Sequence, residues 1–171
     1  MMAAARTLIK LGDISRKICL FDTFDGMSPP TEKDVNVFDK SAAELLKQSS
    51  KNDKISVWSY ASLSEVEQNL QSTGYPRENL NFIQGKVQDT IPENAPKEIA
   101  LLRLDTDWYE STYHELVHLY PRLVKNGVLM IDDYGHWKGA REATDAYFEQ
   151  NRVTIFLNRI DYTCRLAIKV E

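Results

Sequence analysis

Residues 99 to 107 read Ile-Ala-Leu-Leu-Arg-Leu-Asp-Thr-Asp, and residues 128 to 134 read Val-Leu-Met-Ile-Asp-Asp-Tyr. In each stretch a short apolar run ends directly in carboxylates, which is typical of a buried strand in a parallel sheet. Ligands of open α/β sheets bind outside the carboxyl ends of the strands. The acidic residues after these runs are therefore the first candidates for a functional site.

Other apolar runs alternate with stretches of helical spacing on both sides of this region. Further strands are expected at 17–21 and 81–84, and helices at 1–11, 35–50, 62–73, 111–124 and 139–150. Such alternation predicts one doubly wound α/β domain with helices on both faces of its sheet. Two last runs, 153–157 and 164–170, are joined by so short a link that we expect an antiparallel hairpin.

The composition is that of an ordinary globular domain. The 171 residues are 43% hydrophobic and 27% charged, with a formal net charge of -4. This charge argues against a nucleic-acid partner, and no apolar run reaches the roughly 20 residues of a membrane span. The first residues lack the order of a secretion signal, so we expect a cytoplasmic protein.

The strand-end carboxylates predict a cation site. If the strands at 99–104 and 128–131 are neighbours, Asp105, Asp132 and Asp133 converge, and such a group is stable only with a cation among them. The ligands are all oxygen, which favours Mg²⁺ over Zn²⁺. The alternative for any single aspartate, Asp107 above all, is that it caps the following helix.

Several motifs in order along the chain resemble the macrocin O-methyltransferase (TylF) family. The resemblance extends from about Lys17 to Val170, and its motifs are Phe21-Asp-Thr-Phe-Asp-Gly26, Gly85-x-Val-x-Asp-Thr-Ile-Pro92, Leu102-Arg-Leu-Asp-Thr-Asp-Trp-Tyr-Glu-Ser-Thr112 and Ile131-Asp-Asp-Tyr-Gly135. It implies a class I methyltransferase that moves the methyl group of S-adenosylmethionine to a hydroxyl of a sugar or glycosylated small molecule, assisted by Mg²⁺.

The resemblance also implies roles for individual residues. Asp105, Asp132 and Asp133 fall on the metal-ligand positions, and Asp22 falls on the acid that pairs with the cofactor ribose. Gly85, Val87 and Gln88 are expected to line the adenine of the cofactor, and Asp105 is expected to contact the cofactor beside the metal.

The chemistry calls for a base and an acceptor surface. Asp107 and His136 are the candidates to take the proton of the acceptor hydroxyl, and a solvated loop residue is the alternative for His136. Tyr134, Trp137 and Arg141 follow the metal pair and could hold a sugar, although packing is the favoured reading of Trp137.

One family feature is missing from the chain. The expected first strand and its glycine-rich turn, which wraps the methionine end of the cofactor, have no counterpart, and the only glycine before residue 26 is Gly12. We therefore expect a domain truncated at its N-terminus, with unpaired edges at 17–21 and 99–104 that promote homo-oligomers. A non-catalytic remnant that cannot hold the cofactor and, less favoured, a metal-dependent hydrolase are the alternatives.

Overall fold

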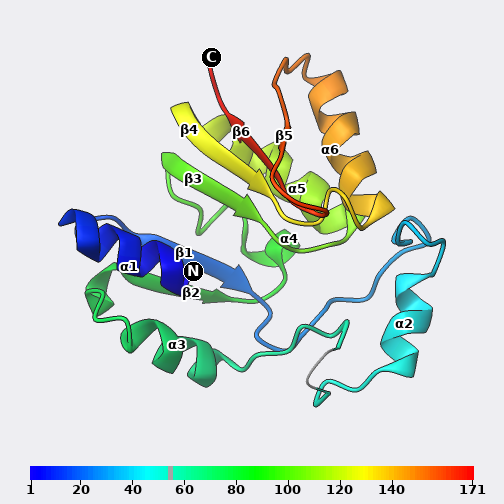
Figure 1. Ribbon diagram of the computed structural model, residues 1–171, viewed down its shortest axis with the longest axis horizontal. Coiled ribbons are helices and arrows are strands. Elements are labelled where there is room, and N and C mark those ends of the chain that lie inside the picture. Colours follow the sequence, from blue (N-terminus) through cyan, green and yellow to red (C-terminus); the bar gives the residue numbers. More distant parts are fainter. Residues whose placement is uncertain (54–55) are drawn as a thin grey trace.

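The computed structural model describes residues 1–53 and 56–171, which form two sheets with helices around them (Figure 1). The elements follow in the order α1 (Met2–Leu11), β1 (Ile18–Asp22), α2 (Ala42–Gln48), α3 (Leu63–Gln71), β2 (Leu80–Gln84), α4 (Val87–Thr90), β3 (Ile99–Leu104), α5 (Tyr109–Leu119), β4 (Leu123–Ile131), α6 (Lys138–Gln150), β5 (Asn158–Arg159) and β6 (Arg165–Ile168). Within the described part of the chain, no helix combines the length and apolarity that a membrane span requires.

The smaller sheet pairs β1 with β2 in parallel. Its register places Ile18 opposite Leu80 and Asp22 opposite Gln84. Helices α1 and α3 pack against it through a core that includes Ala5, Ile18, Leu70, Tyr75 and Leu80. Both strands end at the same edge, so Asp22 and the residues after Gln84 lie together.

The larger sheet has the order β3-β4-β6-β5. Strands β3 and β4 are parallel, with Leu104 opposite Ile131, whereas β6 is antiparallel to both of its neighbours. The parallel β3–β4 register brings Asp105 and Asp132 side by side, as the sequence predicts. The α/β fold and its C-terminal antiparallel hairpin are confirmed.

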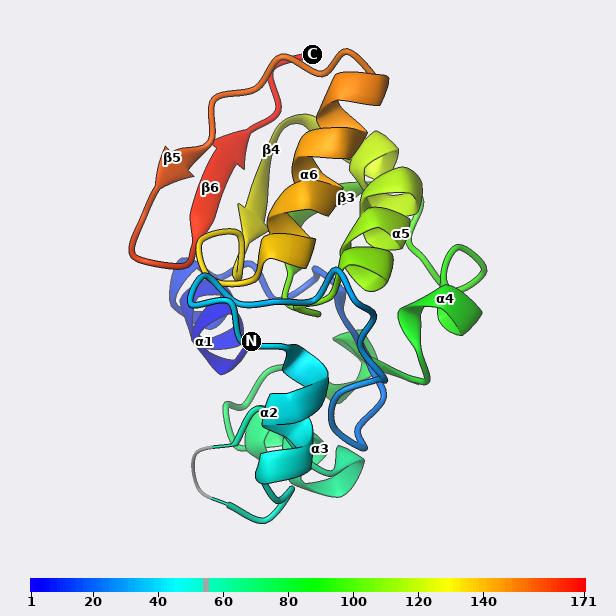
Figure 2. The same ribbon diagram turned by 90° about the vertical axis from the view of Figure 1, so that its right-hand side faces the viewer.

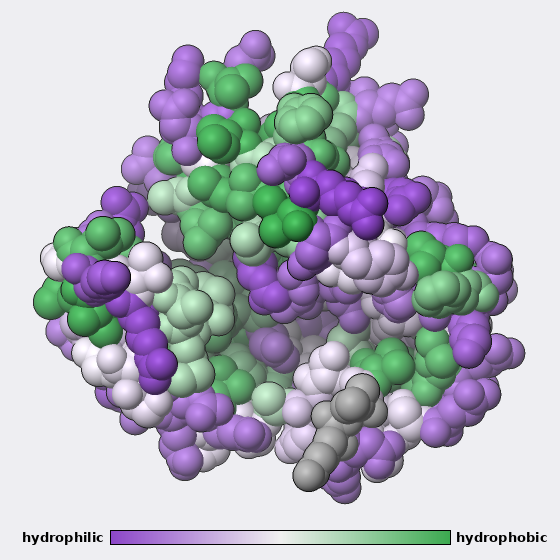
Figure 3. Space-filling view, in the orientation of Figure 1, coloured by the Kyte–Doolittle hydropathy of each residue, from purple (hydrophilic) through white to green (hydrophobic). Residues whose placement is uncertain are grey.

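Helices α5 and α6 both cover one face of the larger sheet (Figure 2). Leu102, Leu104, Leu129 and Ile131 point into the core beneath them. On the opposite face, Leu101 and Ile168 are 49% and 52% exposed. Hydrophobic side chains gather on part of the molecular surface in Figure 3.

The two sheets are not joined by hydrogen bonds in the described part of the chain. Within residues 1–53 and 56–171, β1 pairs only with β2 and β3 pairs only with β4, so each leaves one edge unpaired. Open edges at these two strands agree with the sequence prediction. The face of the molecule is hollowed between the two sheets (Figure 3).

Three element boundaries differ from the sequence prediction. Residues 35–41 form an irregular strap with bridges from Val35 to Ser41 and from Asn36 to Trp137, so helix α2 begins only at Ala42. The strap is not helical because the Asn36 side chain accepts hydrogen bonds from the amides of Phe38 and Lys40, which closes a turn.

The other two differences lie near the ends of apolar runs. Helix α5 ends at Leu119, and Leu123 already belongs to β4. Residues 153–157 are not a strand, and the hairpin forms from 158–159 and 165–168 instead. The side chains of Val153, Ile155 and Leu157 pack on the main core, so their alternation reflects burial without strand pairing.

Candidate active site

Three carboxylates converge at the carboxyl ends of β3 and β4. Oxygens of Asp105, Asp107 and Asp133 all lie within 4.8 Å of one another, and we refer to these residues as the acid cluster. The Asp132 amide donates to the Leu104 carbonyl at 2.9 Å, which joins the two strand ends below the cluster. A set of three close carboxylate oxygens matches the ligand chemistry of a hard divalent cation.

A strained turn directs Asp107 into this cluster. Asp107 has φ +64°, and the Trp108 amide donates to the Thr106 carbonyl at 2.7 Å across it. A non-glycine residue in the left-handed region costs about 1–3 kcal/mol and is most often retained where function requires it. The turn places Asp107 opposite Asp133 and argues against the alternative that Asp107 is only a helix cap.

Asp132 sits beside the acid cluster rather than within it. Its carboxylate pairs with Arg103 at 3.1 Å, and the same guanidinium contacts Asp105 at 2.5 Å. The sequence predicted a ligand set of Asp105, Asp132 and Asp133. The structure brings together Asp105 and Asp133 with Asp107, and it ties Asp132 to Asp105 through Arg103.

Two carboxyls of the cluster, Asp105 and Asp107, have raised pKa values. Burial and a hydrogen bond to Asp132 raise the pKa of Asp105 to about 7, against the opposing effect of Arg103. Burial and a hydrogen bond to Asp133 raise the pKa of Asp107 well above its usual range. Burial is the largest cause of both shifts, and the neighbouring carboxylates add a repulsion that a bound cation would relieve.

A buried glutamate supports the loop from below. Thr106 Oγ1 donates to Glu115 Oε2 at 2.8 Å, and Glu115 is 5% exposed on the inner face of α5. Burial raises the pKa of Glu115 to about 8. Sequence reasoning missed Glu115, although it occupies the same inward helical face as Ser111, Thr112, Leu116 and Leu119.

Four of the predicted cofactor residues, Asp22, Gly85, Val87 and Gln88, lie at or just after the strand ends of the smaller sheet, whereas Asp105 belongs to the acid cluster. Asp22 is exposed at the end of β1, where its Oδ1 accepts from the Phe24 amide at 2.7 Å. The Gly85 amide donates to the Asp22 carbonyl at 2.9 Å, so the two strand ends are in contact. Gln88 is exposed, whereas Val87 is 5% exposed and packs into the core, which leaves only its backbone for a ligand.

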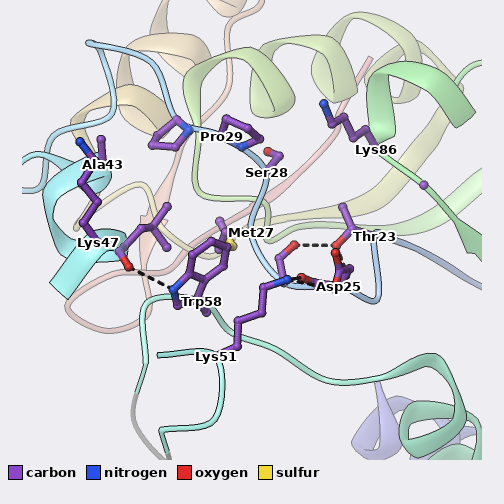
Figure 4. A pocket seen from close by; sticks show the side chains of 14 residues that line it. Thr23, Asp25, Met27, Ser28, Pro29, Ala43, Lys47, Lys51, Trp58 and Lys86 are labelled. Atoms are coloured by element: carbon purple, nitrogen blue, oxygen red, sulfur yellow. Dashed lines mark hydrogen bonds and ion pairs between the residues drawn. The ribbon is translucent and has the colours of Figure 1, made fainter. Parts of the chain in front are cut away.

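A cavity of about 590 Å³ opens beside these strand ends. Gly85 belongs to its lining, and Thr23 lies across the cavity from Trp58 in Figure 4. Met27 and Pro29 also line it. Trp58 Nε1 donates to the Leu46 carbonyl at 3.1 Å, and Lys51 pairs with Asp25 at 2.9 Å. Apolar walls with a few polar groups are typical of small-molecule sites.

A smaller cavity of about 210 Å³ shares part of its lining with the first. Both cavities are lined by Ser28, Pro29 and Lys86, and the smaller one reaches Trp108. Trp108 Nε1 donates to the Ser28 carbonyl at 2.8 Å, which fixes the loop after β1 to the residue next to Asp107. Trp108 therefore connects the smaller cavity to the loop that carries Asp107.

His136 and the predicted acceptor residues lie on the loop after β4. His136 Nδ1 contacts Tyr162 Oη at 3.2 Å, and His136 is not among the residues of the acid cluster. Tyr134 donates to Asp145 at 2.8 Å, Arg141 donates to the Tyr134 carbonyl, and Trp137 is 4% exposed. These contacts give Tyr134 and Arg141 packing partners, and they confirm packing as the role of Trp137.

Comparison with solved structures defines the class of protein. The O-methyltransferase NovP superposes with a TM-score of 0.81 at 26% sequence identity, covering 99% of this chain and 67% of NovP. CalS11, a TDP-rhamnose 3'-O-methyltransferase, superposes with a TM-score of 0.64 at 20% identity, covering 97% of this chain and 64% of CalS11. The fold is that of the O-methyltransferases.

The chain belongs to the macrocin O-methyltransferase (TylF) family, whose model matches residues 1–167. It is 30% identical over 152 residues to the 8-demethyl-8-(2,3-dimethoxy-α-L-rhamnosyl)-tetracenomycin-C 4'-O-methyltransferase of Streptomyces olivaceus, covering 89% of this chain and 54% of the relative. It is also 30% identical over 158 residues to the mycinamicin III 3''-O-methyltransferase of Micromonospora griseorubida, covering 92% and 59%. The chain thus spans little more than half the length of these relatives.

Proposed function

We propose that this chain transfers the methyl group of S-adenosylmethionine to a hydroxyl of a sugar or glycosylated small molecule, with Mg²⁺ in the acid cluster. The observation that carries the proposal is the convergence of Asp105, Asp107 and Asp133 within 4.8 Å. Trp108, which follows Asp107, lines the smaller of two cavities that share part of their lining. Family membership and relatives named for methylation of glycosylated antibiotics support it.

The larger cavity is the proposed place for the adenosine part of the cofactor. It is lined by Thr23 and Gly85, which follow β1 and β2, and the exposed Asp22 carboxylate beside it has the chemistry to accept hydrogen bonds from ribose hydroxyls. Trp58 and Met27 provide the apolar surface that a flat purine requires.

The acid cluster is the proposed place for the reaction. A divalent cation held there supplies electrostatic stabilisation of the negative charge that develops on the acceptor oxygen. Asp107 takes the hydroxyl proton, because its carboxylate lies in the cluster, while the ring of His136 is engaged with Tyr162. The methyl carbon leaves sulfur and bonds to the acceptor oxygen, so the products are the methyl ether and S-adenosylhomocysteine.

Transfer of labelled methyl groups tests this proposal. We expect label from S-adenosylmethionine to appear on an α-L-rhamnoside or TDP-rhamnose, and EDTA to abolish the transfer. Asp107→Asn is expected to lower the rate by about a hundredfold or more, as loss of a general base does. Glu149→Gln, which neutralises an exposed carboxylate at the far end of α6, should leave the rate unchanged.

Two results would contradict the proposal. Equal transfer by the wild type and by Asp107→Asn would remove Asp107 from the reaction. Absence of transfer together with absence of cofactor binding would favour the alternative, a chain that keeps the fold but does not hold the cofactor. As partners we propose only the small-molecule or saccharide acceptor and, through the open strand edges, a second copy of the chain.

A further inference from the structure

Three rings from separate segments form an aromatic surface near the acid cluster. Phe38 and Tyr162 are 69% and 48% exposed, and each packs edge-on against His136, with ring centroids 6.4 Å and 5.9 Å away. We refer to Phe38, His136 and Tyr162 as the aromatic platform. Its members come from the strap, the loop after β4 and the turn of the C-terminal hairpin, which lie side by side in Figures 1 and 2.

Backbone contacts hold the three segments of the platform together. The Val37 amide donates to the His136 carbonyl at 2.9 Å, and the Gly135 amide donates to the Thr163 carbonyl at 2.8 Å. A Cβ atom on Gly135 would lie only 2.0 Å from the Tyr162 carbonyl oxygen. The glycine therefore permits the close approach that places the Tyr162 ring beside His136.

The platform is also fixed to both loops that carry the acid cluster. The His136 amide donates to the Asp133 carbonyl at 3.0 Å. The His136 ring packs edge-on against Trp137 at 5.0 Å, and Trp137 packs against Trp108 at 4.9 Å. Trp108 is 2% exposed and follows Asp107 directly, so this stack holds the platform in a defined position relative to the acid cluster.

The exposed rings of the platform contribute little to the stability of the fold. Burying a phenylalanine side chain stabilises a protein by roughly 1.5–3 kcal/mol, and a Phe38 that is 69% exposed contributes little of this. Exposed apolar surface that is rigidly held beside polar groups more often marks a binding site. Phe156, which is 82% exposed, differs because it has no aromatic neighbour in the described part of the chain.

We propose that the aromatic platform binds a six-membered sugar ring of the acceptor, an inference that rests on the proposed function. The C–H face of a 6-deoxyhexose is apolar and fits against aromatic rings, while the Tyr162 hydroxyl provides a hydrogen-bonding group at the edge of the surface. His136 Nδ1 is engaged with Tyr162 at 3.2 Å, which leaves Nε2 for a sugar hydroxyl. His136 is therefore an acceptor-binding residue rather than the base.

Saturation-transfer NMR and NMR titration with methyl α-L-rhamnopyranoside test the proposal. Phe38→Ala is expected to weaken binding of the rhamnoside about tenfold, equivalent to about 1.4 kcal/mol. Tyr162→Phe, which removes only the hydroxyl, should weaken it about threefold. Phe156→Ala is the matched control, because it removes an equally exposed ring outside the platform and should leave the affinity unchanged.

Calorimetry with S-adenosylhomocysteine on the same proteins separates this proposal from the proposed function. Suppose that all variants bind S-adenosylhomocysteine. If the wild type then fails to bind the rhamnoside, or if Phe38→Ala and Phe156→Ala bind it equally well, the proposal for the aromatic platform is overturned and the proposed function is not. Failure of the wild type to bind S-adenosylhomocysteine would overturn the proposed function, whereas the NMR result would still decide whether the platform binds sugar.

Discussion

Replacing Glu115 by glutamine should make the protein more stable at high pH. Glu115 is 5% exposed, and its pKa is raised by burial from 4.5 to about 8. A carboxyl with a raised pKa contributes its full stability below pH 4.5 and loses it as the pH rises through 8, because the unfolded chain ionises more readily. Glutamine keeps the acceptor for Thr106 Oγ1 and does not ionise.

The size of the effect follows from the two pKa values. Each pH unit between them costs about 1.4 kcal/mol of folding free energy, so the wild type should lose about 3–4 kcal/mol relative to Glu115→Gln between pH 5 and pH 8. Urea unfolding followed by tryptophan fluorescence, with EDTA present at both pH values, measures this difference. Other titrating groups occur in both proteins and largely cancel.

Glu149→Gln provides the comparison, because this exposed glutamate should show no pH-dependent difference from the wild type. A stability difference between the wild type and Glu115→Gln that is the same at pH 5 and pH 8 would refute the reasoning. It would mean that Glu115 ionises as an exposed carboxyl does and that its position below the acid cluster has no electrostatic consequence.

Three further outcomes can be checked by thermal unfolding. Asp34 is fully buried and accepts a hydrogen bond from the Tyr109 amide at 2.8 Å, so Asp34→Ala should lower the free energy of unfolding by about 2–4 kcal/mol. Asp39→Asn, on the neighbouring strap, should change it by less than about 0.5 kcal/mol. Gly135→Ala should cost about 2–3 kcal/mol because its Cβ would meet the Tyr162 carbonyl at 2.0 Å, and a cost below about 1 kcal/mol would contradict the tight contact. Mg²⁺ at ten times its dissociation constant should raise the Tm by about 3–6 °C at pH 8. The increase should be much smaller at pH 5.5, because the carboxyls of the acid cluster must lose protons to bind the ion. Equal increases in Tm at both pH values would mean that the ion binds elsewhere.

The position of the acidic residues at the strand ends could be predicted from the sequence, because parallel pairing of two strands places their carboxyl ends at the same edge of the sheet. The apolar runs end at Leu104 and Ile131, and each is followed directly by an aspartate, so these aspartates must come together once β3 and β4 pair in parallel. Local signals also sufficed for helix α3, where Ser62 accepts from the Glu65 amide as an N-cap, and for the C-terminal hairpin.

Long-range hydrogen bonds explain most of what the sequence did not predict. The strap at 35–41 has a helical pattern, but Asp34 binds the Tyr109 amide 75 residues away and Asn36 closes a turn. The membership of the acid cluster depends on the φ of +64° at Asp107 and on the pairing of Arg103 with Asp132. Neither side-chain direction can be read from residue spacing. The aromatic platform likewise arises only when three distant segments meet.

Calorimetric titration of S-adenosylhomocysteine with and without Mg²⁺ tests the central claim most directly, that the acid cluster and the neighbouring cavity form a methyl-transfer site. The account predicts a dissociation constant of about 100 μM or tighter, roughly -5.5 kcal/mol, for the 171-residue chain, with heat from Mg²⁺ that Asp133→Asn abolishes. Absence of binding to the chain, or Mg²⁺ binding that survives Asp133→Asn, would contradict it.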